Sequence, residues 1–410
     1  MTETSGAHKE GRLRKQQRFV RLLLVAGAIL VALLIAEVAL RVSGFSYFNP
    51  YAPDPDVGYS LRPGAEGWWK KEGLTYVKIN SHGFHDREHT IAKPPNTLRI
   101  AVVGDSFTEA LQVPLENAFW SVMEPKLQHC LQPASAKVEV LSFGVGGFST
   151  AQELVLLQKR VWQFSPDVVV LLVTTGNDVR DNSPTLNAHR DQPIPYFVFQ
   201  NDTLVLDDSL LSARNHSLKF RLRQYIAGRS FYRLQNNLRL LGLLYMIRES
   251  YQASSEATDR RGQQTGLRIE PGADNEVFSN PTTPDWNDAW KLTEGLLLKI
   301  RDEVQAKGAK FLVVTGSMGV QVYPDAQARQ EYMNSLGVSN LFLPDYRIKA
   351  LGERNGFRVL NLAPAFADYA TRNKVFLHGS GEGQGRGHWN ETGHRLAGEL
   401  IAQELCSQAQ

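Results

Sequence analysis

The sequence predicts an α/β fold in which helices cover both faces of a parallel sheet, preceded by one N-terminal transmembrane helix. Short apolar runs alternate with helical segments from residue 98 onward, which is typical of a sheet built from βαβ units. A basic N-terminus followed by a long apolar run predicts the membrane helix. The chain has 410 residues, 42% of them hydrophobic and 21% charged, which is the composition of a globular protein; its net charge of +3 indicates no particular partner.

The N-terminal segment is expected to be an uncleaved signal anchor. The run 22–40 is apolar except for Glu37 and is about long enough to cross a bilayer. Basic residues crowd the chain just before it, namely Lys9, Arg12, Arg14, Lys15, Arg18 and Arg21. They predict a cytoplasmic tail at 1–21, an anchor at 22–42 and an extracytoplasmic remainder. A cleaved signal peptide is an alternative, although no small-x-small site follows the run. A buried core helix is disfavoured because the run is apolar all the way round.

The elements of the sheet domain follow from periodicity and composition. Strands are expected at 98–103, 138–143, 168–174, 310–314 and 358–362, and helices near 114–131, 151–164, 288–306, 345–355 and 392–406. Residues 43–97, rich in proline, glycine and aromatic residues, predict an extended linker with short strands. The domain at 98–408 should hold an insertion at 183–290. The insertion should contain a hairpin at 196–206, a helical stretch at 218–251 weakened at Gly228 and Gly242, and a polar loop at 253–285.

The two cysteines, Cys130 and Cys406, fall on the first and last predicted helices of the sheet domain. In a flavodoxin-like sheet these helices cover the same face, so a disulfide between them is geometrically feasible in an exported protein. Two unrelated buried thiols are the alternative.

Short polar motifs follow the predicted strands. Gly104-Asp-Ser106 comes after the first strand, Gly144-Val-Gly-Gly147 after the second and Gly176-Asn-Asp178 after the third, while Gly387-His388 lies beyond the fifth. The carboxyl ends of parallel strands meet at one edge of the sheet, where open α/β folds keep their active sites. We therefore expect these motifs to share one site.

With these motifs in this order, residues 98–405 resemble the GDSL/SGNH hydrolase superfamily, whose blocks carry Ser, Gly, Asn and His in turn. The segments 79–84 and 176–182 are also similar to membrane-anchored bacterial members of mostly unassigned substrate. The resemblance implies a flavodoxin-like three-layer α/β/α sandwich, the SGNH hydrolase fold, and a serine esterase that needs no cofactor.

The chemistry and the resemblance together predict the roles of the site residues. Ser106 would be the nucleophile and His388 the base that activates it and later protonates the leaving group. The backbone N–H groups of Ser106 and Gly147 and the amide of Asn177 would bind the oxyanion. Choosing Gly147 over Gly144 rests on the family pattern. In the structural alternatives, Ser106 is only a helix N-cap and Asn177 only closes a turn.

The chain departs from the family pattern at the acid. The family has an aspartate three residues before the catalytic histidine, whereas this chain has Gly385 there. Glu382 is the only acid in the glycine-rich loop 379–388 and is the candidate to orient His388. Otherwise a backbone carbonyl orients the imidazole and Ser106 and His388 form a dyad, which is the interpretation we favour.

The sequence therefore predicts an ester hydrolase anchored in the cell inner membrane by a single pass, with a cytoplasmic N-terminus and a periplasmic catalytic domain. Location and resemblance favour an O-acylated glycan as substrate. An O-acyltransferase and a non-catalytic glycan-binding or assembly protein are the alternatives. We expect no nucleic-acid partner, cofactor or metal. His82, His85 and His89 lack the spacing of a metal site. Trp68 and Trp69 fit packing better than a membrane surface or a sugar site.

Overall fold

The computed structural model describes residues 4–130, 137–187, 192–226, 237–258, 267–269 and 273–407. The chain divides into two compact units. The smaller comprises Met1–Asn49 and Leu222–Gln263, and the larger comprises Pro50–Arg221 and Gln264–Gln410. Most of the expected insertion belongs to the larger unit, and only its middle part groups with the N-terminal segment.

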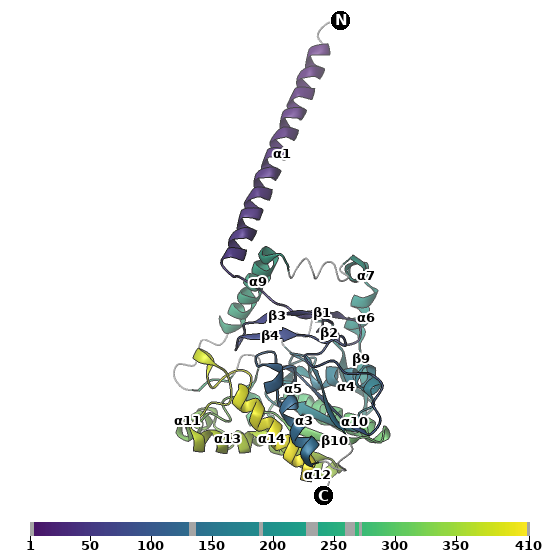
Figure 1. The fold of residues 1–410 in the computed structure, drawn as a ribbon, viewed down its shortest axis with the longest axis vertical. Coiled ribbons are helices and arrows are strands. Elements are labelled where there is room, and N and C mark those ends of the chain that lie inside the picture. The colour runs from purple at the N-terminus through teal and green to yellow at the C-terminus, as the bar shows by residue number, and fades with distance from the viewer. Residues whose placement is uncertain are drawn as a thin grey trace. The chain divides into compact units, whose positions relative to one another are not determined.

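The larger unit is built on a five-stranded, all-parallel sheet with the order β11-β10-β7-β5-β6. The sheet lies among the helices of this unit (Figure 1). Its strands are β5 (Thr97–Gly104), β6 (Lys137–Gly144), β7 (Val168–Val173), β10 (Lys310–Thr315) and β11 (Arg358–Asn361). Numbered along the chain, this is the order 2-1-3-4-5 of the flavodoxin-like doubly wound sheet. All five strands lie where the sequence predicts them, and the predicted fold class is confirmed.

Helices cover both faces of this sheet. Successive residues of a strand point to opposite faces, and here both faces carry apolar side chains that must be buried. Ile100 and Val102 of β5 belong to one buried apolar cluster, and Ala101 and Val103 belong to the other. The first cluster packs under α3 (Phe119–Cys130), α13 (Leu362–Asn373) and α14 (Glu391–Ser407). The second packs under α4 (Thr150–Lys159), α10 (Pro284–Ala306), α11 (Ala326–Leu336) and α12 (Leu343–Asn355).

Three of the expected helices differ at a boundary, and the one expected near 114–131 begins only at Phe119. The helix expected from 288 begins at Pro284, because the Thr283 hydroxyl accepts a hydrogen bond from the backbone N–H of Trp286 and proline suits the first helical position. The helix expected at 151–164 ends at Lys159 and continues as a short 3₁₀ turn, η2 (Val161–Phe164). Other short 3₁₀ turns are η1 (Leu115–Asn117), η3 (Asn275–Phe278) and η4 (Gly381–Gly383).

A disulfide joins Cys130, the last residue of α3, to Cys406 near the end of α14, with their Cα atoms 5.8 Å apart. Both helices lie on the same face of the sheet. The structure therefore contains the expected disulfide rather than two separate thiols.

The segment 43–97 contains the expected short strands, and from Pro50 onward it belongs to the larger unit instead of forming a linker. It forms two antiparallel hairpins, β1 (Tyr51–Asp54) with β2 (Gly58–Leu61) and β3 (Glu66–Trp69) with β4 (Thr75–Lys78). Leu61, Val77 and Ile79 are completely or almost completely buried, so the segment is folded rather than extended. The insertion contributes the expected hairpin, β8 (Tyr196–Gln200) with β9 (Thr203–Asp207), followed by α6 (Ser209–His216) and α7 (Leu218–Ile226).

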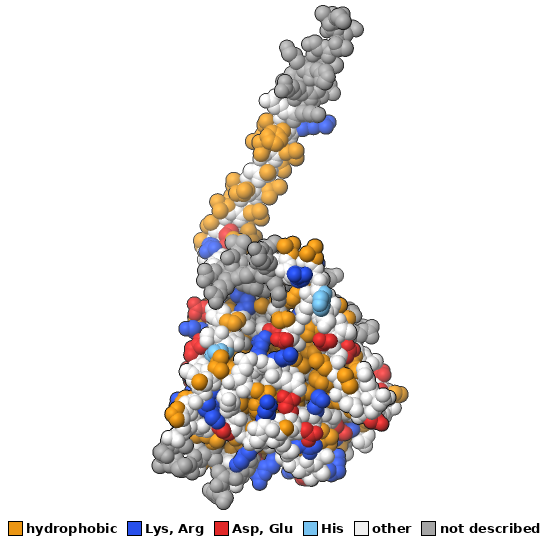
Figure 2. All heavy atoms as spheres, turned by 90° about the vertical axis from the view of Figure 1, so that its right-hand side faces the viewer, with side chains coloured by type: hydrophobic (Ala, Val, Ile, Leu, Met, Phe, Trp, Pro, Cys, Tyr) orange, Lys and Arg blue, Asp and Glu red, His pale blue; other side chains and the backbone are white. Residues whose placement is uncertain are grey.

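The smaller unit contains α1 (Thr4–Val42) and α9 (Arg239–Thr258). Within the described residues, Gln16–Val42 forms a helix long and apolar enough to cross a membrane, and an 18-residue window within it has a mean hydropathy of 2.8. Its apolar side chains are exposed, as Figure 2 shows. The expected helical stretch is thus two helices, α7 and α9, and residues 227–236, including Gly228, lie outside the described part. α9 runs through Gly242 and on to Thr258, so residues 253–258 are helical rather than loop. Of that expected loop, 259–266 and 270–272 also lie outside the described part.

Candidate active site

The first motif places Ser106 at the carboxyl end of the sheet. β5 ends at Gly104, and Ser106 begins the four-residue helix α2 (Ser106–Glu109). Asp105 caps this helix, since its carboxylate accepts a hydrogen bond of 3.0 Å from the backbone N–H of Phe107. The cap belongs to Asp105, which leaves the Ser106 side chain available for other contacts.

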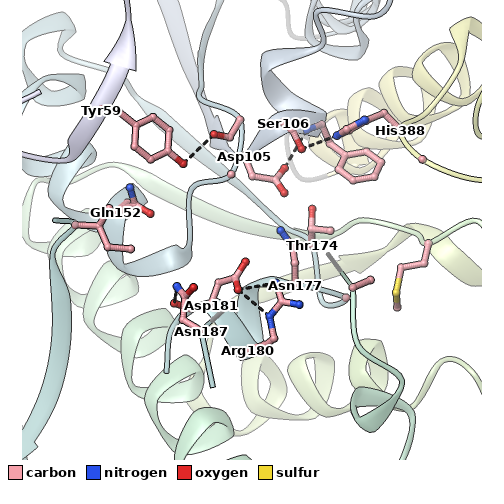
Figure 3. Close-up of a pocket in the computed structure, with 18 of the residues that line it drawn as sticks. Tyr59, Asp105, Ser106, Gln152, Thr174, Asn177, Arg180, Asp181, Asn187 and His388 are labelled. Carbon is pink, nitrogen blue, oxygen red and sulfur yellow. Dashed lines mark hydrogen bonds and ion pairs between the residues drawn. The ribbon is translucent and has the colours of Figure 1, made fainter. Parts of the chain in front are cut away.

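Ser106 contacts His388, which arrives from the opposite end of the chain. Their Oγ and Nε2 atoms are 2.7 Å apart (Figure 3). The other ring nitrogen of His388, Nδ1, lies 2.7 Å from Oε2 of Glu72. A carboxylate only accepts hydrogen bonds, so Nδ1 carries the proton and Nε2 is left to accept from the serine hydroxyl. The three side chains form a serine–histidine–carboxylate relay.

Glu72 corrects the expectation of a dyad or of an acid at Glu382. Glu72 lies in the turn between β3 and β4, with a φ of 58°. Its Oε2 also accepts a hydrogen bond of 2.8 Å from the backbone N–H of His388, and its carbonyl accepts one from the Ser380 hydroxyl. The carboxyl partner of His388 is therefore Glu72. The side chain of Glu382 lies outside the described residues.

Two glycines of the loop 379–388 explain why the acid comes from elsewhere. Gly385 is buried with a φ of 83°, and a Cβ there would lie 2.9 Å from the ring of Tyr323, so no aspartate fits. Gly387 has a φ of 78°, and a Cβ there would lie 2.8 Å from the Glu72 carboxyl group. Neither of these two positions therefore has room for an acid beside His388, and the small glycine at 387 leaves room for Glu72.

The electrostatic environment favours the protonated form of His388. Burial lowers the pKa of His388, but the hydrogen bond and charge of Glu72 outweigh it, so the net pKa is raised. Burial alone would raise the pKa of Glu72, yet its contacts with His388 bring it below its ordinary value. Each group thus stabilises the charged form of the other.

Other carboxyl groups lie buried behind the serine. Burial raises the pKa of Glu109 to about 7 and raises the pKa of Asp105. Burial, together with the charge of Asp105, raises the pKa values of Glu153 and Asp178 further, and the charge of Glu153 adds to the effect at Asp178. Asp105 and Asp178 also accept hydrogen bonds from backbone N–H groups, Asp105 from Phe107 at 3.0 Å and Asp178 from Thr174 at 2.8 Å. The negative charge of Asp105 and Glu109 adds to the raised pKa of His388.

A second series of hydrogen bonds holds the backbone just before His388. The indole N–H of Trp389 donates to Ser317 Oγ at 2.9 Å, and Ser317 Oγ lies 2.9 Å from Nε2 of His378. His378 Nδ1 lies 2.6 Å from the carbonyl oxygen of Gly387, so it carries the proton and Nε2 accepts from Ser317. Burial lowers the pKa of His378 to about 4, which keeps it neutral. Sequence reasoning missed this buried support.

The remaining predicted residues line the same cavity as Ser106 and His388. Gly147 follows β6 with a φ of 75°, and Asn177 follows β7 and precedes the short helix α5 (Asp178–Asp181). The structure thus brings together Ser106, Gly147, Asn177 and His388 from separate strand ends. Glu72 was missed because only its position in a hairpin turn, followed by Gly73, marks it in the sequence.

The site opens into two cavities that share Ser106, Gly147 and His388. The larger has a volume of about 670 Å³. Besides the site residues, much of its lining is polar or aromatic: Tyr51, Tyr59, Gln152, Arg180, Asp181, Asn187 and Gln192. The smaller has a volume of about 270 Å³ and is lined also by Trp69, Lys71, Leu111 and Gln112.

The other histidines have structural contacts. His394 is fully buried and lies 3.0 Å from the side-chain amide of Gln112. His85 Nδ1 lies 2.8 Å from the carbonyl oxygen of Glu109, and His82 Nε2 lies 2.8 Å from that of His89. Among the described residues, no group of three or more His, Cys, Asp or Glu side chains could hold a metal ion.

No protein-family model and no curated protein matches the sequence. Solved structures that are similar include the acetyl xylan esterase AlAXEase, at 15% identity over 75% of this chain and 100% of that chain, with a TM-score of 0.37. A lipase/acylhydrolase from Enterococcus faecalis is 14% identical over 76% of this chain and 96% of its own, with a TM-score of 0.35. A catalytic mutant of the acetylxylan esterase Axe2 from Geobacillus stearothermophilus is 10% identical over 75% and 94%, with a TM-score of 0.36. What the site can do follows from its own geometry.

Proposed function

We propose that the protein is an SGNH-type serine ester hydrolase that works through an acyl-enzyme on Ser106. The observation that carries the proposal is the relay of Ser106, His388 and Glu72, with contacts of 2.7 Å at both nitrogens of the imidazole. A serine hydroxyl needs an adjacent oriented base to attack an ester at neutral pH, and this arrangement supplies one.

The reaction follows the geometry in two steps. Oγ of Ser106 attacks the ester carbonyl carbon while its proton passes to Nε2 of His388, and Glu72 stabilises the imidazolium. The backbone N–H groups of Ser106 and Gly147 and the amide of Asn177 hold the oxyanion. The tetrahedral intermediate collapses as the alcohol leaves with the proton from Nε2. Water, deprotonated by His388, then attacks the acyl-enzyme, and the carboxylic acid leaves as the serine regains its proton.

We propose further that the enzyme is anchored by α1 in the inner membrane of a bacterial cell, with the larger unit on the periplasmic side. The basic residues before the span support a cytoplasmic N-terminus. The Cys130–Cys406 disulfide supports an oxidising compartment for the larger unit.

For the substrate we propose an O-acylated carbohydrate. The accessible lining of the larger cavity is mainly apolar, which suits an acyl group, and Arg180 and Gln192 add polar side chains that can bind the hydroxyls of a sugar. Esterase neighbours named for acetyl xylan are compatible with this substrate class.

Labelling with a serine-directed fluorophosphonate tests the hydrolase proposal. We expect one covalent adduct, located on Ser106 by peptide mass spectrometry, together with hydrolysis of p-nitrophenyl acetate. A folded sample that gives neither adduct nor hydrolysis would instead support a non-catalytic glycan-binding protein.

The smaller cavity favours O-acyl transfer as a second candidate function. It shares Ser106 and His388 with the larger cavity, so an acceptor alcohol there could take the place of water. Acyl transfer to an added carbohydrate that exceeds hydrolysis would decide for the transferase.

Replacing Trp69 with alanine should weaken the use of carbohydrate more than the use of a small ester. Its indole lines the smaller cavity and offers an aromatic surface for a sugar. We expect kcat/KM on acetylated xylo-oligosaccharides to fall by roughly tenfold relative to that on p-nitrophenyl acetate. The neighbouring Trp68, which is 48% exposed and packs on Tyr76, provides the matched control. Equal effects of Trp69→Ala and Trp68→Ala would contradict a sugar subsite at Trp69.

A further inference from the structure

The smaller unit explains the one acidic residue in the apolar run. The carboxylate of Glu37 accepts hydrogen bonds from the backbone N–H groups of Arg239, at 3.1 Å, and Leu240, at 3.0 Å. These residues begin α9. Glu37 also accepts a hydrogen bond of 2.9 Å from Nε of Arg41. A charge in a membrane span is costly unless it is partnered, and here the first turn of α9 and an arginine are its partners.

Because Glu37 binds the first turn of α9, its position along α1 determines where α9 begins relative to the end of the candidate span. Val42 ends α1 and lies about 8 Å further along the helix axis, at a rise of about 1.5 Å per residue. The first turn of α9 therefore lies beside the last turns of the candidate membrane helix (Figure 1). With α1 anchored as proposed above, the end of the span at Val42 is the level at which the bilayer passes from hydrocarbon to head groups.

Aromatic residues just after the span also hold α9. Tyr47 stacks on Tyr245 of α9, with ring centroids 6.3 Å apart and an interplanar angle of 7°. Gly242 permits this packing, because a Cβ there would lie 2.9 Å from Cβ of Tyr47 and 3.7 Å from the ring of Phe45. Aromatic side chains at the end of a span are typical of the membrane–water interface.

Another face of α9 is apolar and exposed. Leu244 is 62% exposed and Ile247 is 54% exposed, and their spacing of three places them on one side of the helix. Gly242 and Tyr245 instead face the aromatic residues that follow α1. Arg248 lies beside the apolar face, where a basic side chain can reach lipid head groups.

We propose that α9 is an interfacial helix that lies in the outer surface of the bilayer, with Leu244 and Ile247 turned into the lipid. The proposal rests on the membrane anchoring by α1 proposed above. It gives the middle part of the insertion a role: residues 239–258 of the smaller unit lie at the membrane, where Glu37 fixes the first turn of α9. The partner of the exposed apolar face is thus a lipid surface continuous with the lipid around α1.

Fluorescence quenching on the full chain in phosphatidylcholine–phosphatidylglycerol nanodiscs tests the proposal. Single cysteines are introduced by Leu244→Cys and Ile247→Cys and labelled with an environment-sensitive NBD group. The two native cysteines are disulfide-bonded and do not react. Leu30→Cys, within α1, controls for insertion of the anchor, and Ile91→Cys, exposed in the larger unit, controls for a label in water.

We expect spin-labelled lipids to quench the labels at 244, 247 and 30, with a shallow spin label acting most strongly at 244 and 247. Aqueous iodide should quench only the label at 91. If iodide quenches the labels at 244 and 247 while spin-labelled lipid quenches the label at 30, then α9 does not lie in the bilayer surface, but anchoring by α1 is supported. Labels at 244 and 247 shielded from both quenchers would show a protein partner instead and would also overturn the proposal. Quenching of the label at position 30 by iodide would contradict the anchoring by α1, and with it the proposal that α9 lies in the bilayer surface.

Discussion

Replacing Ser106 with alanine is expected to lower kcat/KM for p-nitrophenyl acetate by roughly 10⁴- to 10⁶-fold, the range seen when a serine nucleophile is removed. The loss is large because no other group of the relay can form the acyl-enzyme, and His388 is left without a proton to accept from the serine. The remaining rate reflects the oxyanion donors and substrate binding alone. Initial rates and fluorophosphonate labelling, compared with the wild-type protein, provide the measurement.

The Ser106→Ala variant should remain folded. The hydroxyl of Ser106 contacts His388, and the cap of α2 is supplied by Asp105. Its melting temperature should therefore stay close to that of the wild type. Ser335→Ala, on α11 and away from the site, is the matched control and should retain both labelling and hydrolysis. Retention of hydrolysis by Ser106→Ala would mean that another residue is the nucleophile.

Replacing Glu72 with glutamine is expected to lower kcat/KM by roughly 10²- to 10⁴-fold. The amide keeps the size of the carboxyl group but carries no charge to stabilise the imidazolium of His388. It can also turn its NH₂ group toward Nδ1, which favours the wrong tautomer of the ring. Glu382→Gln is the decisive comparison, because it tests the acid suggested by the loop sequence. A large loss in Glu382→Gln with little loss in Glu72→Gln would contradict the assignment.

The pH profile of Glu72→Gln gives an independent readout. His388 acts as a base only when it is neutral, so activity rises with pH through its pKa. Burial lowers that pKa and the interactions with Glu72 raise it above the ordinary value, so loss of the carboxylate should lower it. The acid limb of kcat/KM should then move to lower pH in the variant, even as the maximum rate falls. An unchanged acid limb would mean that Glu72 does not set the pKa of the base.

The sheet and most of the site could be predicted because their signals are local. Each central strand is a short apolar run, and β7 (Val168–Val173) is buried along its whole length. The motif after each strand carries its chemistry within a few residues. Parallel topology then brings Ser106, Gly147 and Asn177 to one cavity without further information.

Glu72 could not be predicted because nothing local connects it to its partner. It is separated from His388 by 316 residues and lies in the turn Lys70-Lys-Glu-Gly73, which in sequence is typical of a solvated hairpin loop. The expectation of an acid near 385 was based only on residues in the same loop as His388. Tyr323, whose ring leaves no space for a side chain at Gly385, is also distant in sequence, so the sequence around Gly385 could not reveal the lack of space.

The prediction of a weak point at Gly242 failed for a related reason. Glycine lowers helix propensity, which made a break at this position a reasonable expectation. The structure keeps Gly242 inside α9, where the absence of a side chain admits Tyr47 from a segment about 200 positions earlier. Tertiary packing outweighs propensity at this position.

The placement of Glu72 in the β3–β4 turn also sets the order in which the enzyme can become active. The acid is synthesised early, the serine next and the histidine near the end of the chain. Joining Glu72 to His388 closes a loop of 316 residues, so this contact depends on long-range structure that forms late in folding. In the proposed mechanism Ser106 therefore lacks its base until His388 has been synthesised and has folded onto the serine.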